Sequence, residues 1–183
     1  MLARLGALNL LSAHRRQALW EVDGLFDDED LFSTPETSTR ENPLLPMNPL
    51  ERLESDYDVS GLTTGPHPMT FLRPHLAHVM CANDLSLGTN GRKVTIAGLV
   101  ICRQRPGTAK GNVFISLEDE TGISNAFVPS LLFEKQRLTI TQEPFLEIDG
   151  QLQNVDGVIS VLAKAIRSLE SPTVLGTQSY DFH

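Results

Sequence analysis

Residues 94–128 read VTIAGLVICRQRPGTAKGNVFISLEDETGISNAFV, and the alternation of apolar and polar residues within them indicates the fold. In its second half, Val113, Ile115 and Leu117 fall on one side of an extended chain, and the residues between them fall on the other. Such alternation is typical of a β-strand with one buried face. A long β run precedes this strand, and a tight turn at 120–122 leads into a returning one. The stretch therefore predicts three consecutive strands.

The rest of the domain follows from the residues on either side of this pattern. The first strand contains Gly98, where a barrel strand can bend. Downstream, residues 129–138 favour a short helix with Ser130 as its N-cap, and residues 145–154 and 158–166 favour two more strands. The predicted order is β-β-β-α-β-β in ~75 residues, which is typical of a mainly β, five-stranded OB-fold (oligonucleotide/oligosaccharide-binding) barrel. A β-sandwich is the alternative, but it needs about seven strands and has no place for the helix.

The residues outside the barrel divide by composition. Residues 27–50 mix acids, Ser, Thr and four of the eleven prolines without periodicity, which predicts a mobile linker. Before it, we expect a helix over 13–22 that begins at Ser12 and has an apolar stripe too narrow for a core of its own. After it, we expect short helices over 49–57 and 69–72. The expected organisation is a helical segment 1–25, an acidic linker 26–50, a loop-rich adaptor 51–90, the OB-fold domain 91–171 and a tail 172–183.

Length and composition bound the class of protein. The 183 residues (20.2 kDa) leave room for one ordinary domain with flanking segments, or for two small domains. No run of ~18 apolar residues could cross a membrane. The two cysteines, Cys81 and Cys102, lack the spacing of a zinc site and are too few for a disulfide scaffold. The sequence predicts an intracellular, cytoplasmic protein without a membrane partner.

The net charge of −8 conceals an uneven distribution. Residues 1–90 hold 6 Lys/Arg and 13 Asp/Glu, whereas residues 91–171 hold 9 of each. Within the barrel, five basic residues occur in succession with no acid between them. Because association follows the local field, the acidic total does not exclude a nucleic-acid partner.

The candidate binding site is the loop 103–111, because it follows the first strand, where this barrel type presents its ligand loop. Basic side chains there would contact phosphates, and Phe114 would stack on bases. The alternative is that the charges form a solvated loop and that the phenylalanines belong to the core. We expect Phe127 in the core, whereas Phe114 fits either interpretation. The candidate nucleic-acid-binding residues are Arg92, Lys93, Arg103, Arg105, Lys110 and Phe114.

The sequence predicts no catalytic residues, no metal site, no cofactor and no small-molecule substrate. The five histidines lack the spacing of a catalytic or metal site, so we expect them on the surface. The acids at 118–120 resemble a metal cluster only at first sight. Neighbouring residues on a strand point to opposite faces, and the turn glycine explains their polarity.

Four segments resemble one family. The run RQRPGTAKG at 103–111, followed by FISLEDETG at 114–122, is similar to the C-terminal barrel of the error-prone DNA polymerase III alpha subunit, a bacterial C-family polymerase. Upstream, DYDVSGLTTGPHPMTFLRPHL at 56–76 resembles the segment that leads into that barrel, and LGALNLLSAHRRQALWEV at 5–22 resembles the end of the family's helix-hairpin-helix region. The ending DFH at 181–183 also matches. The resemblance covers nearly the whole chain, but only the last sixth or so of the family.

The resemblance implies a non-catalytic piece of a DNA-directed DNA polymerase. The parent is a nucleotidyltransferase with a two-metal palm, and this sequence contains none of the palm. The resemblance further implies that the barrel contacts the single-stranded DNA template in DNA replication, repair of DNA damage and translesion synthesis. The peptide DEDLF at 28–32 would fit the groove of a sliding clamp, although it lacks the usual glutamine and an inert linker is favoured.

Two other functions stay open. The pattern of the barrel is also similar to the anticodon-binding barrels of class II aminoacyl-tRNA synthetases, although those lie ahead of a large catalytic domain. From a different class, the barrel would be a protein-docking module for other damage-synthesis proteins, with its charged loop facing a partner. Affinity for DNA distinguishes these possibilities.

Overall fold

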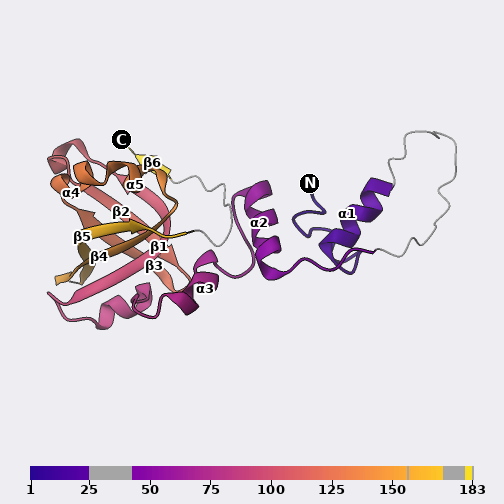
Figure 1. Cartoon of the computed structure of the whole chain (residues 1–183), viewed down its shortest axis with the longest axis horizontal. Coiled ribbons are helices and arrows are strands. Elements are labelled where there is room, and N and C mark those ends of the chain that lie inside the picture. Colours follow the sequence, from indigo (N-terminus) through magenta and orange to yellow (C-terminus); the bar gives the residue numbers. More distant parts are fainter. Residues whose placement is uncertain (25–42, 156, 171–179, 183) are drawn as a thin grey trace. The chain divides into compact units, whose positions relative to one another are not determined.

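The computed structural model of this chain describes residues 1–24, 43–155, 157–170 and 180–182. The chain forms two compact units, Met1–Gly65 and Pro66–His183 (Figure 1). The division falls within the segment 51–90 that composition grouped together. Each unit is described by itself.

The second unit contains the OB-fold barrel that the sequence predicts. Four of its strand pairs are antiparallel, namely β1–β2, β2–β3, β1–β4 and β4–β5. A short parallel pairing of β3 with β5 closes the barrel. The bounds of the strands are β1 Lys93–Gln104, β2 Val113–Asp119, β3 Gly122–Val128, β4 Phe145–Val155 and β5 Val158–Ser168.

Strand β1 serves both sides of the barrel, as its glycine suggested. Its first half pairs with β4 and its second half with β2, with a register shift between Val100 and Cys102. At Gly98, a Cβ atom would lie 2.5 Å from the carbonyl oxygen of Glu118, which is far inside van der Waals contact. Only glycine lets the two strands approach this closely at the bend.

The barrel interior is filled by the inward residues of the alternating strands. Val113, Ile115 and Leu117 of β2 are all nearly or fully buried, as their spacing predicts. They pack into one cluster with residues of every other barrel strand, and Phe133 and Ile140 join this cluster from the helical connection. Each such side chain stabilises the fold by about 1.5–3 kcal/mol.

Two short helices connect β3 to β4, where the sequence predicted one helix over 129–138. They are α4 Ser130–Lys135 and α5 Arg137–Gln142. Gln136 separates them because its side-chain amide bonds to β5: Nε2 donates to the Ile166 carbonyl at 2.7 Å, and Oε1 accepts from the Ile166 N–H at 3.1 Å. Ser130 was also wrongly predicted as the N-cap. Pro129 occupies that position, and no side chain caps the helix.

Short helices lead into the barrel, in the loop-rich manner that the prolines indicate. They are α3 Pro68–Leu72, η1 Arg73–His75 and η2 Ala82–Leu87. His67 caps α3 through Nδ1, which accepts from the Met69 N–H at 3.2 Å. The expectation of a surface histidine is wrong here, because the His67 side chain is only 17% exposed and its burial lowers its pKa.

Asp119, at the end of β2, fastens this leading segment to the barrel. Its Oδ1 accepts hydrogen bonds from the N–H groups of Thr121 and Gly122 at 2.7 and 3.0 Å, and from Thr121 Oγ1 at 2.6 Å. Its Oδ2 accepts from the Ala82 N–H at 2.8 Å and from Arg73 Nη2 at 3.2 Å. Burial opposes ionisation of this carboxyl, but the hydrogen bonds from Thr121, Ala82 and Gly122 together outweigh it and lower the pKa of Asp119.

A further strand lies near the end of the chain, in the segment 172–183 that the sequence assigned to a tail. Strand β6, Tyr180–Phe182, pairs in parallel with Cys102–Gln104 of β1. This part of β1 lies beyond its pairing with β4, so its edge is open to a partner. A strand of three residues carries too little pattern for sequence reasoning to find it.

The first unit contains α1 Arg15–Gly24 and α2 Pro49–Ser60. The start of α1 was wrongly predicted at Ser12: this hydroxyl donates to Glu21 at 2.5 Å, and His14 Nδ1 accepts from the Gln17 N–H at 3.1 Å near the helix start. Residues 1–11 form turns rather than helix. The beginning of α2 follows the prediction and is fixed by a capping box between Asn48 and Glu51.

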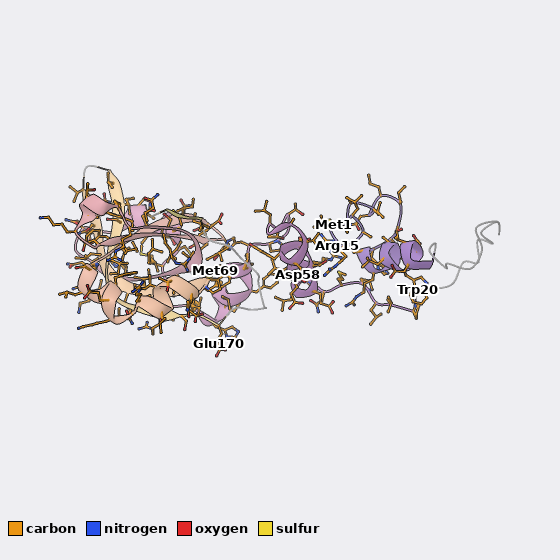
Figure 2. The ribbon with its side chains drawn as sticks, turned by 90° about the horizontal axis from the view of Figure 1, so that it is seen from above. Met1, Arg15, Trp20, Asp58, Met69 and Glu170 are labelled. Atoms are coloured by element: carbon orange, nitrogen blue, oxygen red, sulfur yellow. The ribbon has the colours of Figure 1, made fainter. Side chains whose placement is uncertain are left out.

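A buried ion pair holds these two helices together. Arg15, which is labelled in Figure 2, has its Nη1 2.6 Å from Asp56 Oδ1, and the two side chains are only 11% and 6% exposed. Asp56 Oδ2 also accepts from Thr63 Oγ1 at 2.9 Å. The narrow apolar stripe of α1, predicted to be too small for a core, is thus supplemented by a polar contact that the sequence pattern does not reveal.

Candidate nucleic-acid interface

The loop between β1 and β2 is built by two left-handed residues in succession. After the short helix η3, Gly107–Ala109, Lys110 adopts φ 51° and Gly111 adopts φ 85°. Lys110 is the one non-glycine residue with positive φ in the described chain, a conformation that costs about 1–2 kcal/mol. The turn presents the Lys110 side chain to solvent at the tip of the loop.

Arg105 is the second exposed cation of this loop. Its guanidinium carbon lies 4.9 Å from the centroid of the Phe133 ring. The aromatic face steadies the side chain by a cation–π contact but leaves its N–H donors available. Within the described residues, neither Arg105 nor Lys110 has a carboxylate partner in an ion pair.

Arg103 has a different position from the one its sequence neighbours suggest. Its Nε donates to the Ile140 carbonyl and its Nη2 to the Glu143 carbonyl, both at 2.6 Å. These oxygens lie at the end of α5, where helix carbonyls lack intrahelical partners. The guanidinium is therefore engaged in the fold, and we leave Arg103 out of the proposed interface.

Two phenylalanines form a pair on the outer face of β2 and β3. Phe114 is paired with Phe127 across the strands, and their ring centroids are 5.3 Å apart in an edge-to-face arrangement. Phe114 is 42% exposed. Phe127 is half-buried and lies on this same outer face, so the prediction that it belongs to the core is wrong. The reason is the register: its neighbours Ala126 and Val128 are the residues that point inward.

The Phe114–Phe127 pair lies next to the loop. Gln104, the last residue of β1, pairs with Phe114, and Ser116 follows on the same face with its hydroxyl 2.8 Å from Asn125 Oδ1. The exposed surface thus passes from polar side chains, through two aromatic rings, to a loop with two available cations. In OB-folds, this face and this loop are the usual position for an oligonucleotide.

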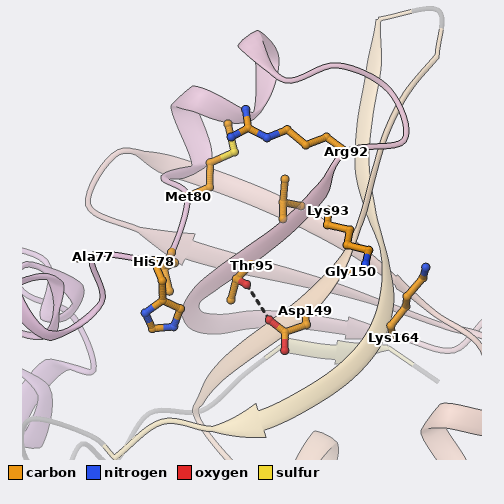
Figure 3. Close-up of a pocket in the computed structure, with 11 residues that line it drawn as sticks. Ala77, His78, Met80, Arg92, Lys93, Thr95, Asp149, Gly150 and Lys164 are labelled. Carbon is orange, nitrogen blue, oxygen red and sulfur yellow. Dashed lines mark hydrogen bonds between the residues drawn. The ribbon is translucent and has the colours of Figure 1, made fainter.

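Arg92 and Lys93 lie elsewhere. They are at the beginning of β1, up to roughly 36 Å along the strand from its last residue at about 3.3 Å per residue. There they border a shallow pocket of about 630 Å³ (Figure 3). The pocket also contains Lys164 of β5. Sequence reasoning missed this cation because it lies 71 residues after Lys93 in the chain.

The pocket has one carboxylate, and it is engaged by a hydrogen bond and an ion pair. Asp149 Oδ1 accepts from Thr95 Oγ1 at 2.6 Å, and Oδ2 lies 2.8 Å from Arg167 Nη1. These two contacts, the Thr95 hydrogen bond first, lower the pKa of Asp149. No group of three or more His, Cys, Asp or Glu side chains suited to a metal ion occurs in the described parts of the chain.

Comparison with known proteins agrees with this architecture. Residues 94–169 match the model of a family described as an OB-fold nucleic acid binding domain, named for the tRNA anticodon. The whole chain is 40% identical over 187 residues to the C-terminal part of an error-prone DNA polymerase from Azoarcus sp. (strain BH72), and 40% identical over 188 residues to one from Pseudomonas fluorescens (strain Pf0-1). The resemblance noted from the sequence motifs is confirmed.

The chain spans only 18% of the length of each of these two relatives. Among solved structures, asparaginyl-tRNA synthetase from Pyrococcus horikoshii is 21% identical, with a TM-score of 0.39 over 45% of this chain and 20% of that one. None of the helices in the described residues combines the length and apolar character needed to cross a membrane.

Proposed function

We propose that the barrel binds single-stranded DNA, as the non-catalytic, template-contacting end of a polymerase used in damage-tolerant synthesis. The observation that carries the proposal is the exposed Phe114–Phe127 pair beside a loop with two available cations. A function of this kind operates in the bacterial cytoplasm, where the DNA template lies. It requires neither a metal nor a cofactor from this chain.

The aromatic pair favours a single strand over a duplex. A base can stack on Phe114 only when the base is free of its own neighbours, as in a single strand. Each base stacked on an aromatic ring contributes about 1–3 kcal/mol, whatever its identity. Because Phe127 supports Phe114 edge-on at 5.3 Å, the ring that meets the base is held in place before binding.

The loop supplies the electrostatic part of binding. Arg105 and Lys110 would each neutralise one phosphate, which gives a slope of about −0.7 per phosphate in log K against log salt. Two such contacts predict a total slope of about −1.4. Binding by this surface is thus weak, without strong sequence preference, and sensitive to salt.

The matched family model is named for the tRNA anticodon, so RNA is the second candidate ligand. We favour DNA because the relatives that match the full length of the chain are named as DNA polymerases. A protein-docking role for other damage-synthesis proteins or the sliding clamp remains the alternative from a different class. The candidate clamp peptide at 28–32 lies outside the described residues.

Fluorescence anisotropy with labelled oligo-dT and oligo-rU, over a series of salt concentrations, tests the proposal. The Phe114→Ala variant should bind oligo-dT about 5- to 150-fold more weakly, which corresponds to the loss of one stack. The Arg105→Ala/Lys110→Ala variant should lower the salt slope by about 1.4. Lys135→Ala/Arg137→Ala is the matched control, since it removes two exposed cations from α4 and α5.

The outcomes separate the candidates. Preference for oligo-rU would favour the anticodon-type alternative. Absence of binding at low salt, in a protein shown by NMR to be folded, would exclude nucleic acid and favour protein docking. An equal effect of the control variant would show that binding follows total charge rather than the loop.

A further inference from the structure

The pocket at the beginning of β1 is a built feature rather than a random hollow. On one side, residues 77–80 run along β1, where the Met80 N–H donates to the Thr95 carbonyl at 2.8 Å. This bond occupies the edge of β1 that is not paired with β4. On the other side, β4 and β5 form the wall. All of these residues belong to the unit Pro66–His183.

An irregularity in the sheet brings Lys164 to this wall. Asp149 pairs with Ala165 and Gly150 pairs with Ala163, so Lys164 is the extra residue of a β-bulge. The bulge requires glycine at 150, because a Cβ atom there would lie 2.5 Å from the Leu162 carbonyl oxygen. Bulges re-aim single side chains and are frequent next to binding sites.

The result is a group of three cations without counter-charges. Arg92, Lys93 and Lys164 form no ion pair with another described residue. Figure 3 shows Lys93 and Lys164 extending toward the same side, while Arg92 extends across to Met80. The carboxylate of Asp149 is held by Thr95 and by Arg167, which it shares with Glu147, and it forms no ion pair with any of these three cations.

Part of the lining is apolar, next to the polar side chains of His78 and Thr95. Val79 and Val94 are buried, and Met80 is half-buried beside them. The Met80 thioether would make a favourable contact with an aromatic ring of a ligand. The volume of the pocket, about 630 Å³, lies in the range of small-molecule sites, roughly 300–1,000 Å³. Such a site offers cations to an anionic group and apolar side chains to a flat ring, so it suits a ligand that carries both.

We infer that this pocket binds one nucleotide: its phosphate between Lys93 and Lys164, and its base against Met80, beside Arg92. The inference deepens the proposed function, on which it rests, by giving the barrel a second contact remote from the β2–β3 face. The nucleotide comes either from a free nucleoside phosphate or from one unit of the DNA strand. The two sources share one chemistry, and the test separates them.

The test is an NMR titration of the full chain, followed through the backbone amides of Lys93, Gly150 and Lys164. Deoxythymidine monophosphate, thymidine and inorganic phosphate are the free probes, and oligo-dT of about 4 and about 16 nucleotides are the strand probes. We expect the monophosphate to shift these three amides saturably below about 10 mM, more tightly than thymidine or phosphate alone. Lys93→Ala/Lys164→Ala should weaken this binding about tenfold or more.

Strand binding is read from the same amides. If the longer oligonucleotide shifts them and the shorter one shifts only the β2–β3 face, the pocket holds a unit of the strand. If only the monophosphate shifts them, the pocket holds a free nucleotide. In both cases Lys135→Ala/Arg137→Ala, which removes two exposed cations that lie in neither site, should leave the monophosphate affinity unchanged and is the matched control.

Two results would overturn the inference. One is the absence of saturable shifts at the three amides with every probe. The other is an unchanged titration in Lys93→Ala/Lys164→Ala when its spectrum shows a folded barrel. Oligonucleotide binding confined to the Phe114 face would then leave the proposed function intact. Monophosphate binding without any oligonucleotide binding would support the nucleotide pocket and contradict the proposed function.

Discussion

Replacing Asp119 by asparagine should destabilise the barrel strongly although it changes the side chain little in size. An amide offers one acceptor oxygen, so its NH₂ must face either the Ala82 N–H and Arg73 or the N–H groups of Thr121 and Gly122. Two buried hydrogen bonds to a charged acceptor are lost, and donors are brought against donors. At about 1.5–3 kcal/mol per bond, the expected loss is about 3–5 kcal/mol.

The measurement is urea unfolding followed by NMR intensities of barrel amides such as those of Ile115 and Leu117. These residues are fully buried and report on the barrel alone. With m of about 1.5–2 kcal/mol/M, the midpoint should fall by roughly 1.5–3 M. Glu118→Gln, one residue earlier in β2, is the matched control, and it should change the free energy of unfolding by less than about 0.5 kcal/mol because this side chain is 43% exposed.

The dependence on pH gives the argument a second test. The pKa of Asp119 is lower in the folded protein than in the unfolded chain, so its contribution is complete above the unfolded value of about 3.9. The contribution is lost as the pH falls through the folded pKa. The difference between wild type and Asp119→Asn should therefore be constant from pH 7 to about 5 and shrink below pH 4. A loss under about 1 kcal/mol at pH 7, or a difference that persists in acid, would show that Asp119 does not fasten the leading segment to the barrel in this way.

Three further predictions follow from other parts of the unit. Gly98→Ala should lower the free energy of unfolding by about 1–3 kcal/mol, because the new Cβ meets backbone at 2.5 Å. Gly107→Ala, with nothing within 4 Å of its Cβ, should leave the free energy of unfolding unchanged when both variants are compared by thermal unfolding. Arg103→Ala should lower the free energy of unfolding by about 2–3 kcal/mol, because two hydrogen bonds to α5 are lost. The oligonucleotide affinity of the folded protein should stay within about twofold of the wild-type value. A large loss of affinity with unchanged stability would contradict the assignment of Arg103 to the fold. Since the folded pKa of His67 lies below 6.5, the wild type should lose stability as the pH falls below 6.5. His67→Asn keeps a capping oxygen but does not titrate, so it should reduce this dependence of stability on pH. Urea midpoints measured at several pH values compare the two proteins.

The barrel itself could be predicted because its pattern is local. The alternation at 113–117 and the turn at 120–122 are each specified within a few residues, and Gly98 marks a bend in its own strand. The same is true of α2, whose capping box lies within four residues. The resemblance to error-prone polymerases added the identity of the relatives, and the match along the whole chain agrees with it.

The errors arose where the deciding contact is distant in the sequence. Arg103 looks like part of a basic loop until α5 supplies two carbonyls from positions 140 and 143. Phe127 looks like core until the register places it opposite Phe114. Lys164 carries no signal at all, because only a bulge in the folded sheet brings it near Lys93. No local periodicity encodes such pairings.

The Gln136 amide has a consequence for how the barrel avoids self-association. The parallel pairing of β3 with β5 joins only Ala126–Val161 and Phe127–Leu162, so the edge of β5 beyond it has no strand of the described residues beside it. At Ile166, the Gln136 side chain makes both hydrogen bonds that the peptide group of a neighbouring strand would make. An unpaired edge is a template on which a second molecule can add a strand and begin an aggregate. Here one glutamine occupies that template from within, and the seam of the barrel is closed to a foreign chain without a further strand.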